Sequence, residues 1–149
     1  MLSQTTEYAL RAVIWLAQHR GSPQTTAQIR EATKVPISYL AKVLQSLRRA
    51  SIVGAVRGLH GGFELAGSPE TISILDIVNI VDPVPRIKLC PLGLQSHQGQ
   101  LCPLHRKLDL AMEMVENSFR STSLADLLNP EKGSKPLCET LHSIAGARV

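Results

Sequence analysis

The spacing of apolar residues predicts three helices in the first 50 residues of the chain. Residues 5–18 are apolar nearly all round and contain no glycine or proline, which predicts a buried first helix. Thr25 and Gln28, three residues apart, form a capping-box pattern, so a short second helix is expected to run to about Thr33. A third helix is expected over residues 38–50, because apolar residues recur there at helical spacing. These residues are Leu40, Val43, Leu44 and Leu47.

The next segment predicts a β-hairpin and a fourth helix. Two runs rich in β-branched and aromatic residues, 52–57 and 63–65, flank a glycine-rich tip. Ser73 and Asp76 form a second capping pattern at the start of an apolar run. The fourth helix is expected to end at Asp82, just before a proline, and the first domain is therefore predicted to cover residues 1–82.

The rest of the chain predicts a long loop followed by a long helix. Residues 83–102 contain three prolines and two glycines without a sustained period, and a loop of this length is usually functional or disordered. Apolar residues then follow helical spacing over residues 103–120 and form a stripe on one side of the predicted helix. The stripe consists of Leu104, Leu108, Ala111, Met112, Val115 and Phe119. A short helix near residues 124–128 and a polar tail complete the third segment, residues 103–149.

Composition and charge limit the possible classes of function. No apolar run approaches the roughly 18 residues of a membrane-spanning helix, so a cytoplasmic protein without membrane contact is expected. The net charge is +4, but residues 1–60 carry eight lysines and arginines against two acidic residues. A positive amino-terminal part favours an anionic polymer as the partner. A solvated basic surface without a partner is the alternative.

Three short helices followed by a hairpin have the element order of a winged helix-turn-helix. The fold class expected is therefore mostly α with a small β-hairpin, extended by a long carboxyl-terminal dimerisation helix. The third helix suits the major groove of DNA, and the hairpin tip suits a narrow minor groove. Candidate DNA-binding residues are Ser38, Tyr39, Lys42, Gln45 and Arg49 on the helix, and Arg57 and His60 on the hairpin. A winged-helix module that binds a protein partner is the alternative.

Three cysteines in this length are too few and too unevenly spaced for a disulfide scaffold, so metal or redox chemistry is the question that they raise. Cys102 directly precedes Pro103 and is expected at the cap position of the long helix, with His105 on the same helical face. Together with Cys90, these residues suit zinc or an iron–sulfur cluster in ligand type. A thiol switch and ordinary free thiols are the alternatives. Cys138, in the tail, has no evident partner.

Four runs of the sequence resemble one known family. They are TEYALRAVIWLA, PISYLAKVLQSLRRASIV, VRGLHGGFELA and ISILDIV. Along nearly its whole length the chain is similar to the Rrf2 family of winged-helix transcriptional regulators, which includes IscR, NsrR and CymR. The resemblance implies a homodimer joined by the long carboxyl-terminal helix, in which each subunit contacts one half of a near-palindromic DNA operator. The apolar stripe on that helix agrees, because a two-fold dimer is the commonest way to bury it.

The resemblance also bears on the cysteine loop. Iron–sulfur sensors of the family carry three cysteines with five residues between them, and the fourth ligand is a histidine three residues beyond the last cysteine or a carboxylate of the first helix. This sequence keeps the first and last cysteines in register, but Ser96 stands in the middle position. The resemblance therefore implies a [2Fe–2S] cluster. Its expected ligands are Cys90, Cys102, His105 and Glu7, with His97 a less favoured one.

The function expected is that of a dimeric DNA-binding transcriptional regulator that acts as a repressor. An iron–sulfur cluster, or the thiol redox state of the loop from Cys90 to His105, is expected to control its affinity for the operator. A regulator without a cluster or redox sensing is the alternative. No enzymatic activity is expected, because Cys102 and His105 have no third orienting group and no oxyanion site.

Overall fold

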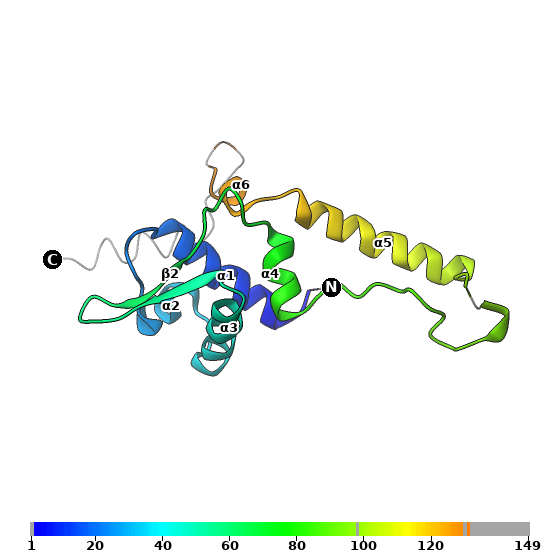
Figure 1. The fold of residues 1–149 in the computed structure, drawn as a ribbon, viewed down its shortest axis with the longest axis horizontal. Coiled ribbons are helices and arrows are strands. Elements are labelled where there is room, and N and C mark those ends of the chain that lie inside the picture. Colours follow the sequence, from blue (N-terminus) through cyan, green and yellow to red (C-terminus); the bar gives the residue numbers. More distant parts are fainter. Residues whose placement is uncertain (1, 98, 130, 132–149) are drawn as a thin grey trace.

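Short helices pack together in the amino-terminal half of the chain with a two-stranded hairpin at their side, and one long helix projects from this half (Figure 1). The computed structural model describes residues 2–97, 99–129 and 131. In chain order the elements are α1 (Gln4–Gln18), α2 (Thr26–Thr33), α3 (Ile37–Arg49), β1 (Val53–Val56), β2 (Gly62–Leu65), α4 (Ile74–Val81), the 3-10 helix η1 (Gln95–His97), α5 (Pro103–Arg120) and α6 (Leu124–Leu128). This architecture confirms the predicted mostly α fold with a small β-hairpin and a long helix after it.

We call α1 to α4 and α6 the body, and α1 lies at its centre. Because α1 is apolar on nearly every side, it packs against α2, α3, α4, β2 and α6 at once. Its small side chains at Ala9 and Ala12 are fully buried and allow the neighbouring helices to approach closely. The four residues predicted to form the inner face of α3, Leu40, Val43, Leu44 and Leu47, are all buried. The polar face of α3 is consequently turned to solvent.

Side-chain caps fix the starts of α2 and α4. The Thr25 hydroxyl accepts a hydrogen bond from the Gln28 N–H at 3.2 Å, and the Gln28 side chain accepts one from the Thr25 N–H at 2.8 Å. Ser73 and Asp76 form the same reciprocal pair at the start of α4. Each box satisfies backbone donors that the first helical turn leaves unpaired, a contribution of about 1 kcal/mol. Both predicted capping boxes are confirmed.

The hairpin, which we call the wing, is tied to the body at Gln24. β1 and β2 are antiparallel, with Val53 opposite Leu65. The backbones of Gln24 and Phe63 exchange two N–H···O hydrogen bonds, both of 2.8 Å. The side-chain oxygen of Gln24 accepts a third hydrogen bond, from Nε1 of the buried Trp15 at 3.1 Å. Gln24 therefore links the central helix to the root of the wing through both its backbone and its side chain.

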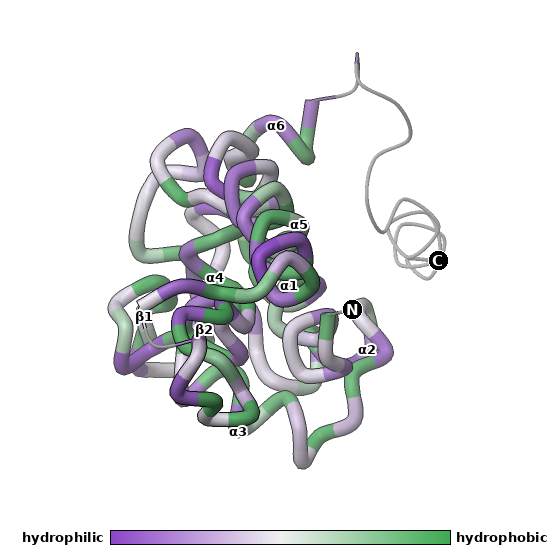
Figure 2. Tube along the Cα trace, turned by 90° about the vertical axis from the view of Figure 1, so that its right-hand side faces the viewer, coloured by the Kyte–Doolittle hydropathy of each residue, from purple (hydrophilic) through white to green (hydrophobic). Residues whose placement is uncertain are grey.

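Residues 82–122, which we call the arm, leave the body and return to it. The chain runs outward after α4, turns near η1 and comes back along α5 (Figure 1). Leu124 then anchors the return, since it is fully buried and its N–H donates to the Ile72 carbonyl at 2.9 Å. No side chain of α5 is buried, and hydrophobic and hydrophilic positions follow one another along it (Figure 2). Neither α5 nor another helix in the described part of the chain is long and apolar enough to cross a membrane.

Candidate nucleic-acid interface and cysteine loop

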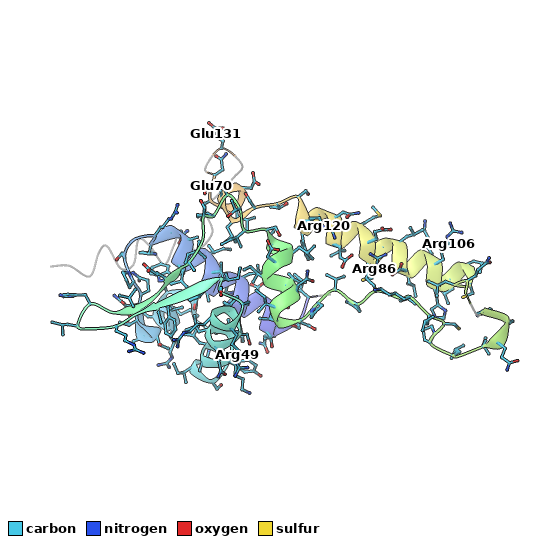
Figure 3. The ribbon with its side chains drawn as sticks, in the orientation of Figure 1. Arg49, Glu70, Arg86, Arg106, Arg120 and Glu131 are labelled. Atoms are coloured by element: carbon cyan, nitrogen blue, oxygen red, sulfur yellow. The ribbon has the colours of Figure 1, made fainter. Side chains whose placement is uncertain are left out.

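The exposed face of α3 is rich in hydrogen-bond donors. Ser38, Lys42 and Gln45 are exposed along the helix, and Arg49 is exposed at its carboxyl end (Figure 3). The apolar side chains on the opposite face hold this helix against α1, so the donor face has a fixed orientation. The major groove of DNA admits one helix and presents acceptors on its base edges and phosphates. α3 has the shape and the donors for that groove.

Tyr39 is half exposed but held in place by a second aromatic ring. The residue is 41% exposed, and its ring packs edge-on against that of Tyr8, with 5.4 Å between the ring centroids. The Arg11 guanidinium lies 5.9 Å from the centre of the Tyr8 ring and donates a hydrogen bond to Glu7 at 3.0 Å. Glu7, the predicted carboxylate ligand, is thus connected through two residues of α1 to the first turn of α3.

Carboxylates do not neutralise the donor face of α3. In residues 2–97, 99–129 and 131, ion pairs join Glu7 to Arg11 and join Arg86 to carboxylates of α5. Lys42 and Arg49 take part in neither pairing. Their charges therefore remain available to a polyanion, whose approach a positive surface accelerates.

The tip of the wing projects two further donors. Arg57 and His60 are exposed, and Leu59 between them is 95% exposed, so the tip has little packing of its own. Gly58 has φ +108°, a conformation that L side chains rarely adopt. β1 contacts α3, so the tip extends from a strand that lies beside the donor face. Arg57 and His60 are therefore exposed on the same side of the body as a strand that contacts α3.

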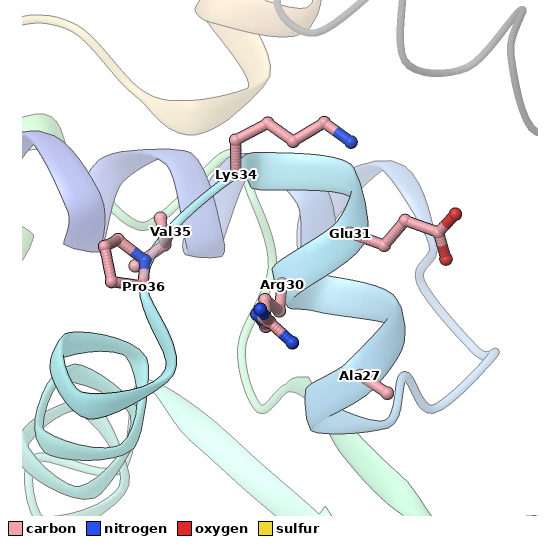
Figure 4. A pocket seen from close by; sticks show the side chains of 6 residues that line it. All are labelled: Ala27, Arg30, Glu31, Lys34, Val35 and Pro36. Atoms are coloured by element: carbon pink, nitrogen blue, oxygen red, sulfur yellow. The ribbon is translucent and has the colours of Figure 1, made fainter.

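Two positively charged side chains that were not among the predicted site residues line a hollow beside α2. It has a volume of about 670 Å³ and is lined by Ala27, Arg30, Glu31, Lys34, Val35 and Pro36 (Figure 4). Arg30 and Lys34 are both exposed, and they extend the positive surface to the helix before α3. Arg30 lies on α2, and Lys34 follows that helix as its C-cap residue in the left-handed conformation. Both side chains face solvent, whereas Ile29 and Thr33 are buried.

Each cysteine of the loop lies beside a histidine. Cys90 Sγ is 3.4 Å from His97 Nδ1, and Cys102 Sγ is 3.3 Å from His105 Nδ1. The hydrogen bond from His97 is the main reason why the pKa of the Cys90 thiol lies below its usual range. Cys102 occupies the N-cap position of α5, and Pro103 follows in the first turn, as predicted. The loop therefore presents two thiol–imidazole pairs.

The predicted four-ligand set is not gathered in one place within the chain. No three histidine, cysteine, aspartate or glutamate side chains of the described residues lie close enough together to share a metal ion. Glu7 lies on α1 and is paired with Arg11, whereas the cysteine pairs lie on the arm. Ser96, which takes the place of the middle cysteine, is exposed. Cys138 lies outside the described residues.

Arg86 fastens the outgoing part of the arm to α5 (Figure 3). Its guanidinium donates to both carboxylate oxygens of Asp109, at 2.8 and 2.9 Å, and to Glu116 at 2.8 Å. The N–H of Ile87 donates to the same Asp109 carboxylate at 2.8 Å. These hydrogen bonds, that of Arg86 above all, hold the pKa of Asp109 at about 2. We call Arg86, Asp109 and Glu116 the clamp; its two-point contact with Asp109 fixes orientation as well as distance.

The predicted apolar stripe of α5 is divided between two environments. Met112, Val115 and Phe119 line a hollow of about 290 Å³ where the arm joins the body, together with Leu2, Val84 and neighbouring residues of the outgoing chain. Further out, Leu104 is 64% exposed and Leu108 is 44% exposed. The inner part of the stripe therefore packs against its own chain, and the outer part faces solvent.

Comparisons with known proteins agree with this geometry. The family model Rrf2, described as an iron-dependent transcriptional regulator, matches residues 2–130. An HTH-type transcriptional regulator of Aquifex aeolicus (strain VF5) is 30% identical over 135 residues, which cover 89% of this chain and 94% of the relative. CymR, the global cysteine regulator of B. subtilis, superposes with a TM-score of 0.72 at 26% identity, covering 85% of this chain and 95% of its own. T. potens IscR superposes with a TM-score of 0.73 at 25% identity, covering 91% and 93%. The chain therefore belongs to the Rrf2 family of DNA-binding transcriptional regulators, and its relatives are regulators rather than enzymes.

Proposed function

We propose that the protein is a homodimer that binds a near-palindromic operator with α3 and the wing of each subunit. The observation that carries the proposal is the donor face of α3, which is exposed, positive and rigidly backed by four buried residues. In this proposal Ser38, Tyr39, Lys42, Gln45 and Arg49 contact the major groove, and Arg57 and His60 contact the minor groove or its phosphates. A second copy places an equivalent α3 about 34 Å away, one turn of DNA.

The outer part of α5 supports the homodimer. Leu104 and Leu108, one turn apart, are 64% and 44% exposed on a helix that extends away from the body (Figure 1). A single exposed leucine is ordinary, but two adjacent ones on one side of a projecting helix favour an apolar partner surface. A two-fold axis supplies that surface from the same helix of a second copy.

The cysteine loop is proposed as the sensory element. Residues 1–82 would then be the DNA-binding domain, residues 83–102 the effector loop, and residues 103–149 the dimerisation segment. The donor chemistry of the loop fits a [2Fe–2S] cluster in kind, since thiolates and imidazoles both ligate its irons. Such a cluster supplies a one-electron redox centre when bound, and the two thiols of the loop supply an alternative redox chemistry.

The clamp gives the loop a mechanical connection to the dimer helix. Arg86 lies four residues before Cys90, and Asp109 lies four residues after His105, so the clamp joins the two ends of the loop. A change in the shape of the loop would therefore act on the inclination of α5 against the body. That inclination sets the separation of the two α3 helices, and a coupling of about 1 to 3 kcal/mol to operator affinity is typical of such devices.

Footprinting of genomic fragments, followed by affinity measurements over a range of salt concentrations, tests the proposal. Lys42→Ala and Arg57→Ala are expected to weaken binding, and each lost phosphate contact should reduce the slope of log affinity against log salt by about one. Lys107→Ala, which removes an exposed lysine of α5 at a distance from α3, is the matched control. Binding that has no preferred sequence, or that neither α3 nor wing substitution changes, would contradict the proposal.

A further inference from the structure

The start of α3 has no side-chain cap. In α1, α2, α4 and α6, a serine or threonine hydroxyl before the helix accepts a hydrogen bond from a backbone N–H of the first turn. α3 begins after Pro36, which makes no such hydrogen bond. The first turn of α3 carries Ser38 and Tyr39, two of the candidate DNA contacts. Since a cap normally stabilises the first turn of a helix, other contacts have to take its place here.

Arg11, on α1, holds the turn that leads into α3. Its Nη1 donates a hydrogen bond at 3.4 Å to the carbonyl of Thr33, the last residue of α2. The end of a helix leaves this carbonyl without a partner inside the helix, and only residues 34–36 separate it from α3. Nε of the same guanidinium donates to Glu7 at 3.0 Å. Because the guanidinium is planar, two acceptors on different atoms restrict its orientation.

The Tyr8 ring joins Arg11 to the first turn of α3. The Arg11 guanidinium lies 5.9 Å from the centre of this ring, within the reach of a cation–π interaction. Tyr8 is only 9% exposed, so its ring has a fixed place in the body. The ring of Tyr39 meets it at an interplanar angle of 69°, in the edge-to-face geometry that aromatic pairs prefer. The inner side of Tyr39 is therefore held, while the rest of the residue is exposed.

We infer that Arg11 is the positioning residue for the DNA-contacting start of α3. It acts through the Thr33 carbonyl, which fixes the turn, and through the Tyr8 ring, which fixes Tyr39. The inference rests on the proposed operator binding and deepens it, because it names what makes that binding selective. A side chain distinguishes one base pair from another only when it is held in a defined place. Arg11 contacts no DNA in this arrangement.

Operator fragments that differ by single base pairs test the inference. Their affinities at one fixed salt concentration are measured for wild type, Tyr39→Ala and Arg11→Met. Tyr39→Ala identifies the positions at which the start of α3 selects a base. At the same positions, Arg11→Met should lower the preference for the favoured base by about 5-fold or more, the effect of losing recognition of one base pair. Elsewhere in the operator, the preferences should stay as in wild type.

Two further arginine variants separate geometry from charge. Arg11→Lys keeps the charge but should lose the preference, because one ammonium group cannot replace a planar guanidinium that serves two acceptors. Arg20→Met removes the same charge from an exposed residue just beyond α1 and should keep the preference.

The tyrosine pair provides a test that does not depend on the folding of Arg11→Met. Tyr8→Phe keeps the ring and should keep the base preference, whereas Tyr8→Leu removes the ring and should lower it at the same positions. In a Tyr39→Ala background, Arg11→Met should lower the preference no further, because the residue that it positions is already absent. Trp15 fluorescence during urea unfolding shows that each variant is folded under the assay conditions.

The outcomes distinguish this inference from the proposed function. An unchanged preference in Arg11→Met overturns the inference, and so does equal weakening of its binding to every fragment. A slope of log affinity against log salt that falls by about one in Arg11→Met also overturns it, because Arg11 would then be a phosphate contact. The same holds if Arg20→Met changes the preference or if Tyr39→Ala removes it at no position. A wild-type chain that prefers no base at any position overturns the proposed operator binding, and the inference with it.

Discussion

The body and the arm are stabilised in different ways. The body has a continuous core in which Leu16, Ile29 and Leu47 are at most 1% exposed, and α2 and α4 begin at side-chain caps. In the arm, α5 has no buried side chain and is attached to the outgoing chain by the clamp and a small apolar hollow. A small chemical change does not disturb a core held by apolar burial. The same change can rearrange a region that only a few polar contacts hold in place. The contrast suits a rigid DNA-binding unit joined to a responsive sensor.

The largest expected effect on stability comes from truncating a buried side chain in the core of the body. Leu47→Ala should lower the free energy of unfolding by about 2 to 5 kcal/mol, because it removes a fully buried side chain. Leu108→Ala, the matched change on the arm, should lower it by under about 1 kcal/mol while weakening the dimer, since Leu108 is 44% exposed. Urea unfolding followed by fluorescence of Trp15, the one tryptophan, reports on the body. Equal losses of unfolding free energy in the two variants would contradict the proposed difference between the body and the arm.

A smaller effect is expected at the root of the wing. A Cβ added at Gly62 would lie 2.5 Å from the Gln24 carbonyl oxygen, and this contact forces the wing away from the body. Gly62→Ala should therefore cost about 1 to 3 kcal/mol and also weaken operator binding. Gly54→Ala is the control, because its Cβ would meet only the Glu64 side chain at 3.9 Å. If both variants have the stability and the DNA affinity of wild type, the Gln24 attachment does not position the wing.

The smallest effect concerns the clamp and depends on pH. The Asp109 pKa of about 2 lies below the ordinary aspartate value of about 3.9, so its carboxylate stabilises the fold fully above the ordinary value. That contribution is lost as the pH falls toward 2. Wild type should therefore be more stable than Asp109→Asn at pH 6, and urea unfolding should show this difference shrinking between pH 4 and pH 2.

A second acidic residue calibrates the clamp. Glu113→Gln should show a smaller difference from wild type than Asp109→Asn, because its carboxylate lies 3.9 Å from Arg86 and accepts no short hydrogen bond from it. A difference for Asp109→Asn that stays constant down to pH 2 would show that the carboxylate does not stabilise the arm through its charge.

Local sequence patterns predicted the body well, because the determinants of its helices are close together along the chain. The capping residues Thr25 and Gln28 and the four apolar residues of α3 each identify a helix without reference to distant parts of the molecule. The attachment of the wing at Gln24 could not be predicted in this way. It depends on a contact with Phe63, which is far along the chain and leaves no local pattern.

The sequence singled out the cysteines and histidines of the loop, but it predicted the contacts of these and neighbouring side chains less completely. The spacing of Cys102 and His105 at the start of one helix correctly predicted that their side chains lie close together. The pairing of Cys90 with His97 requires the turn that ends in η1, and no periodicity announces that turn. Arg86 reaches α5 across 23 residues of sequence, so the clamp became visible only when the arm was folded.

The most direct test of the account is the operator affinity of one preparation with and without its reconstituted cluster. Fluorescence anisotropy with a labelled operator fragment, at a single fixed salt concentration under argon, measures both dissociation constants. The account predicts that they differ by about 5-fold to 150-fold, the range that a coupling of about 1 to 3 kcal/mol gives. Equal dissociation constants in the two states would contradict it, because the arm would then carry no signal to the DNA-binding surface.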